Sequence, residues 1–138
     1  MAALKTLWSG LALLFHLIFT ILLVGLGGLS LGGATRLNLE MLPWTGNTLD
    51  LVLLGSGLFG LLTVILAAAG KHRYLFFLWS LIAAVALTKF MIFSSYTFPS
   101  GSWKAAAWLL AGTWFSAAGA FFLMRALPAP GPRKYRVK

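Results

Sequence analysis

Four apolar runs, separated by short polar stretches, restrict the fold of this chain more than any other feature. They extend over about residues 7–31, 51–69, 74–93 and 103–124. A helix needs roughly 20 consecutive apolar residues to cross the hydrocarbon core of a bilayer. Because that core offers no partners for unpaired backbone groups, each run must be helical. We therefore predict an all-α integral membrane protein with four transmembrane helices.

The composition excludes a soluble domain. Of the 138 residues, 60% are hydrophobic and only 9% are charged, whereas soluble domains carry about a quarter charged residues. We predict one four-helix transmembrane domain over residues 1–127. Residues 128–138 form a basic, proline-rich tail that contains too few apolar side chains to build a core.

The basic residues predict the orientation. Short connections arrange the four helices as two antiparallel hairpins. With the N-terminus inside, eight basic residues lie on the inner side and only Arg36 and Lys104 on the outer side. Lysine and arginine concentrate on the cytoplasmic side of membrane proteins, so we expect both termini on the inner side of a bacterial inner membrane. The inner residues are Lys5, Lys71, Arg73, Arg125, Arg133, Lys134, Arg136 and Lys138.

Six of these inner basic residues mark a surface for docking. Their placement at the ends of apolar runs indicates contact with anionic lipid headgroups, not binding of nucleic acid. Docking of an acidic soluble partner is the alternative interpretation. The six are Lys71 and Arg73 in the connection "GKHRY", and Arg133, Lys134, Arg136 and Lys138 in the tail.

His16 is an ionisable residue near the middle of the first predicted helix. Such residues are candidates for function by default. A neutral imidazole could be the single axial ligand of a chlorophyll-type pigment or haem. A bis-histidine haem site within this chain is excluded, because His72, the only other histidine, lies in a connection. The stronger expectation is a hydrogen bond from His16 to another helix or subunit, on a face that it shares with Ser9 and Thr20. The sequence requires no cofactor and indicates no metal site.

Small residues at four-residue spacing predict where helices approach closely. The pattern favours packing inside the bundle, and a docking face for another protein is the alternative. The residues are Gly28 and Gly32 in the first run, Ser56 and Gly60 in the second, and Gly112 and Ser116 in the fourth.

Lys89 is a charged residue within the third apolar run. Counting outward from the turn between the second and third runs places it about one helical turn deeper than Asp50. Because a lysine in a membrane helix extends toward the nearer surface, we predict an ion pair between Lys89 and Asp50. Glu40 is the alternative partner for Lys89 in this ion pair.

The sequence carries no catalytic signature. Its two carboxylates and two histidines are scattered, and an enzyme would need such groups at converging positions. We expect a non-catalytic accessory or scaffold subunit of a larger membrane complex, respiratory or photosynthetic, that contacts anionic lipids and other membrane subunits. The alternative is a small homo-oligomeric transporter or channel.

Overall fold

A computed structural model describes residues 1–34, 36, 39–40, 42–95 and 97–126 of the chain. The described part contains four helices and no strand: α1 (Ala2–Leu31), α2 (Asn47–Ala68), α3 (Arg73–Ile92) and α4 (Ser102–Arg125). All four are long and apolar enough to cross a membrane. The prediction of a helical chain with four helices able to span a membrane is therefore confirmed for the described residues, and it indicates an integral membrane protein. The predicted tail, 128–138, lies outside the described residues.

The helices α1 and α2 end with the same C-terminal capping geometry. Gly33 and Gly70 follow the last turns of the two helices with φ angles of 75° and 76°, which a residue without a Cβ adopts at no steric cost. The next amides, of Ala34 and Lys71, donate to the carbonyls of Leu29 and Leu66. This Schellman pattern satisfies carbonyls that a helix end leaves unpaired, so both helices stop where the sequence supplies glycine.

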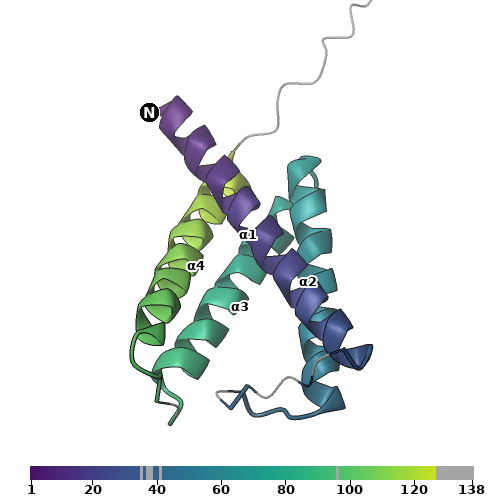
Figure 1. Cartoon of the computed structure of the whole chain (residues 1–138). Coiled ribbons are helices and arrows are strands. Elements are labelled where there is room, and N and C mark those ends of the chain that lie inside the picture. The colour runs from purple at the N-terminus through teal and green to yellow at the C-terminus, as the bar shows by residue number, and fades with distance from the viewer. Residues whose placement is uncertain (35, 37–38, 41, 96, 127–138) are drawn as a thin grey trace, which may run out of the picture.

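The helices form a ring in which α1 packs against α2 and α4, and α3 packs against α4 and α2. The interface between α1 and α2 is the largest of these four, and the one between α2 and α3 is the smallest. Figure 1 shows α1 crossing the bundle obliquely. The N-terminus, the α2–α3 connection and the end of α4 lie at one end, and the other two connections lie at the opposite end (Figure 1).

The interior of the bundle combines small side chains, polar side chains and a few large apolar ones, such as Phe76 and Leu49. Between 22% and 33% of each apolar window is buried, so most residues of each window keep some exposed surface, and many large apolar side chains, such as Leu14, Ile18 and Leu62, are exposed. The buried polar side chains belong to Ser9, His16, Thr20, Asp50, Thr63, Ser80, Thr113 and Ser116. Polar groups that could serve a function therefore lie in this interior and at the ends of the bundle.

Candidate functional site

His16 belongs to α1 and is fully buried, with its side chain in contact with α4. Its Nδ1 is 3.2 Å from the carbonyl oxygen of Ala12 and 3.1 Å from Oγ of Ser116 on α4. The Ser116 hydroxyl donates to the carbonyl of Thr113, 3.2 Å away. Because a carbonyl can only accept, the proton of the neutral ring is assigned to Nδ1, which donates to Ala12 and Ser116. His16 thereby links the two helices through a hydrogen-bond chain that ends on a backbone carbonyl.

This assignment leaves Nε2 of His16 with a free lone pair and no hydrogen-bond partner within the described residues. The ring is enclosed by aromatic neighbours: the ring centroid of Phe76 lies 5.2 Å away, and those of Phe15 and Phe19 lie 5.5 and 6.4 Å away. A haem or chlorophyll could be ligated only if one edge of the imidazole were accessible to the macrocycle. The His16 side chain has 0% exposure, so no edge is accessible. The geometry therefore favours the interhelical hydrogen bond over the axial-ligand interpretation.

Three other buried hydroxyls are satisfied within their own helices. Thr20, Thr63 and Ser80 each donate to a carbonyl three or four residues earlier, at 2.7 Å. Serine and threonine commonly do this in helices. Among the described residues, no cluster of three or more histidine, cysteine, aspartate or glutamate side chains could hold a metal ion.

Two further side chains join α1 to α4 near the N-terminal end of α1. Trp8 Nε1 donates to the carbonyl of Phe115 at 2.9 Å, and Ser9 Oγ donates to the carbonyl of Gly119 at 3.3 Å. The Trp8 ring stacks on the Phe115 ring with centroids 4.8 Å apart. Sequence reasoning placed Ser9 on the His16 face but missed the role of Trp8.

Three of the predicted packing residues, Gly60, Gly112 and Ser116, face neighbouring helices. A Cβ at Gly60 would lie 2.6 Å from the Trp79 ring, and one at Gly112 would lie 2.8 Å from the Phe15 ring. Oγ of Ser116 is the hydrogen-bond partner of His16.

The other predicted packing residues do not make the close approach between α1 and α2. Gly28 has open space around it, and a Cβ at Gly32 would meet only carbonyls of its own helix. Ser56 is half-buried and donates to the carbonyl of Leu53. The two helices instead approach closely at Gly27, next to Gly28 in the sequence, and at Gly57, next to Ser56.

A Cβ at Gly27 would lie 2.6 Å from the backbone nitrogen of Leu54 in α2. One at Gly57 would lie 2.8 Å from the backbone nitrogen of Val24 in α1. A signal for Gly27 was present in the sequence, since it follows Thr20 by seven residues on the face that also carries Ser9 and His16.

The predicted ion pair between Lys89 and Asp50, both described, does not form. Lys89 Nζ lies 6.0 Å from the centroid of the Phe90 ring, and Oδ1 of buried Asp50 has no hydrogen-bond partner in the described part. The prediction assumed that α2 and α3 lie closely side by side, whereas the main neighbour of α2 is α1. Lys89 lines a pocket of about 390 Å³ that Glu40 also lines, but no ion pair joins these two described side chains either.

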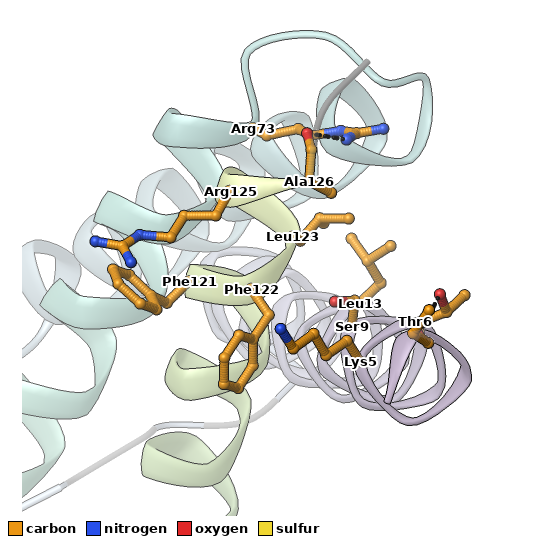
Figure 2. Close-up of a pocket in the computed structure, with 12 residues that line it drawn as sticks. Lys5, Thr6, Ser9, Leu13, Arg73, Phe121, Phe122, Leu123, Arg125 and Ala126 are labelled. Atoms are coloured by element: carbon orange, nitrogen blue, oxygen red, sulfur yellow. Dashed lines mark hydrogen bonds between the residues drawn. The ribbon is translucent and has the colours of Figure 1, made fainter. Parts of the chain in front are cut away.

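A larger pocket lies at the opposite end of the bundle, between α1, α3 and α4 (Figure 2). It has a volume of about 690 Å³, and its lining includes the basic side chains of Lys5, Arg73 and Arg125. Arg73 Nη1 donates to the carbonyl of Ala126 at 3.1 Å, which ties the start of α3 to the end of α4. This basic pocket was not predicted, although each of its three cations was assigned to the inner side.

The other basic residues that were predicted to contact lipid or a partner do not belong to this pocket in the described part of the chain. Lys71 is exposed in the α2–α3 connection and does not line the basic pocket. Arg133, Lys134, Arg136 and Lys138 lie outside the described residues.

No protein-family model, no curated protein and no solved structure matches this chain at a significant level.

Proposed function

We propose that this protein is a non-catalytic accessory or scaffold subunit that packs against larger proteins in a bacterial inner membrane. One observation carries the proposal. Gly25 and Gly28 in α1 and Gly32 at its C-cap are exposed, and the surroundings of Gly25 and Gly28 are open. Small residues at this spacing let a second helix backbone approach closely. Because α1 uses Gly27, and not these residues, against α2, the exposed glycines are free for a helix of another protein.

Substituting Gly28 with leucine tests this proposal. The side chain would project into open space, so the stability of the isolated chain should not change. Association with a partner helix should weaken about 5–150-fold, because overfilling a tight contact costs about 1–3 kcal/mol. The measurement is the stoichiometry of chains that co-purify with a tagged copy from gently solubilised membranes.

The matched control is Gly55→Leu, since Gly55 is also exposed with open surroundings but lies on α2. It should leave co-purification unchanged. Full recovery of the partner chains with Gly28→Leu would contradict the proposal. A stable homo-oligomer that transports solutes in liposomes would favour the small transporter or channel instead.

The proposed topology is two antiparallel hairpins with both termini on the inner side. The arrangement in Figure 1 supports it, because the end of the bundle with the N-terminus and the α2–α3 connection carries Lys5, Lys71, Arg73 and Arg125. Basic residues favour the cytoplasmic side of a membrane.

Cysteine labelling in intact cells tests the orientation, because the natural chain contains no cysteine. Thr45 and Ser100 are exposed in the two connections at the predicted outer end, and Lys71 is exposed at the inner end. Thr45→Cys and Ser100→Cys should react with a thiol reagent that cannot cross membranes. Lys71→Cys should react only after the cells are permeabilised, and its labelling in intact cells would overturn the orientation.

A further inference from the structure

The basic pocket between α1, α3 and α4 carries positive charge that no acidic side chain neutralises. Lys5, Arg73 and Arg125 line it from three different helices. The whole chain has only two acids, Glu40 and Asp50, and neither lines this pocket. The uncompensated charge of the pocket indicates an anionic ligand.

Most of the hydrogen-bond donors on the three cations of the pocket have no partner among the described residues. A guanidinium has five N–H donors. Arg73 donates to a neutral carbonyl, that of Ala126, and its buried Nε has no partner among the described residues. Lys5 Nζ lies 5.8 Å from the Phe122 ring centroid, and the Arg125 guanidinium carbon lies 4.4 Å from that of Phe121. Cation–π contacts of this kind hold the cations but do not neutralise them, so a group with several anionic oxygens suits the pocket.

Apart from Thr6 and Ser9, the rest of the lining is apolar and extends into the membrane-spanning part of the bundle. From Lys5 to Leu13, both of which line the pocket, α1 rises by roughly 12 Å. Leu123 and the rings of Phe121 and Phe122 complete this apolar wall (Figure 2). A ligand with an anionic head and a hydrocarbon chain matches a site that changes from basic to apolar over this depth.

We propose that this pocket binds one anionic phospholipid, with its phosphate among Lys5, Arg73 and Arg125 and an acyl chain along Leu13. Basic pockets between helices on the cytoplasmic side suit anionic headgroups. A volume of about 690 Å³ lies within the usual range of about 300–1,000 Å³ for ligand sites. The inner leaflet as the source of the lipid follows from the proposed topology, whereas binding itself depends on neither the topology nor a partner subunit.

Thermal unfolding of the purified full chain in a neutral detergent tests the site, with dioleoylphosphatidylglycerol added at increasing concentration. A ligand that binds only the folded state raises the unfolding temperature with concentration, which yields an apparent Kd. Phosphatidylglycerol should stabilise the protein, and dioleoylphosphatidylcholine and inorganic phosphate should do so far less. Equal stabilisation by phosphatidylcholine would overturn the proposal, and equal stabilisation by phosphate would show a site for a soluble anion instead.

Variants then locate the binding. Lys5→Gln and Arg125→Gln should each weaken the apparent affinity for phosphatidylglycerol about fivefold. Lys71→Gln is the matched control, because the α2–α3 connection that contains Lys71 lies at the same end of the bundle, whereas Lys71 does not line the pocket. It should change the affinity less than twofold. An equal effect of Lys71→Gln would indicate diffuse surface attraction and overturn the assignment.

Gly10→Leu is a steric variant that leaves the charge unchanged. Gly10 lines the pocket, and a Cβ there would meet no atom within 4 Å, so the fold should tolerate the larger side chain. The leucine should occupy the apolar part of the pocket and weaken binding about tenfold, in line with the loss of a well-packed apolar contact. Unchanged affinity in Gly10→Leu would overturn the proposal even if the charge variants failed to fold.

Discussion

Replacing Gly27 with alanine is expected to destabilise the bundle by about 1–3 kcal/mol, the usual cost of overfilling a packed interior. The added Cβ would lie 2.6 Å from the backbone nitrogen of Leu54 and 2.9 Å from the carbonyl oxygen of Asp50. Backbone atoms cannot move aside as a flexible side chain can, so α1 and α2 would have to separate. The loss should appear as a lower unfolding temperature of the purified protein in detergent.

Gly28→Ala is the matched control for this experiment. The substitution is identical, the position is one residue away, and the Cβ would have no neighbour within 4 Å. Alanine is intrinsically a better helix former than glycine by about 0.8–1.0 kcal/mol, so this variant should be as stable as the natural protein or slightly more stable. Equal losses from the two substitutions would contradict the observed packing of α1 on α2.

Replacing His16 with alanine is expected to cost about 2–4 kcal/mol, as for other large-to-small substitutions in a packed core. The ring is fully buried, and its Nδ1 is 3.1 Å from Oγ of Ser116. Ser116→Ala alone should cost about 0.5–1.5 kcal/mol, the net contribution of one hydrogen bond. Unfolding measurements on both single variants and the double variant should give a coupling free energy of about 0.5–1.5 kcal/mol.

Ser9→Ala provides the control cycle with His16→Ala. Ser9 is buried on the same face of α1, but its hydroxyl donates to the carbonyl of Gly119. It lies seven residues from His16, or roughly 10 Å along the helix, so the two losses should be additive. Coupling in the Ser9 cycle as large as in the Ser116 cycle would contradict a direct contact. A visible absorption band that disappears in His16→Ala would restore the axial-ligand interpretation.

The sequence by itself determined that the protein is helical and has four segments able to cross a membrane. Those properties depend on hydropathy summed over about 20 residues, and the length required is set by the bilayer. The predicted span 74–93 differs by one residue at each end from α3, Arg73–Ile92. Both α1 and α2 begin four or five residues earlier than predicted, at Ala2 and Asn47, because a helix can continue beyond the apolar run that identifies it.

The sequence also predicted part of the candidate site. The face with Ser9, His16 and Thr20 could be derived because helix geometry alone brings residues at this spacing together. The same spacing extends to Gly27, the residue that packs on α2. The Gly28 and Gly32 pattern pointed to a different face, because a pair of glycines at four-residue spacing does not show which neighbour, if any, uses it.

Only the tertiary structure decided which helices are neighbours. The ion pair between Lys89 and Asp50 was predicted from a short connection, yet α2 packs mainly on α1. The basic pocket likewise combines Lys5, Arg73 and Arg125 from three helices far apart in the sequence. In a membrane, apolar side chains are as well accommodated by lipid as by another helix, so hydropathy does not select the buried face. Close backbone approach and a few interhelical hydrogen bonds make that selection, and both depend on atoms that meet only in the folded bundle.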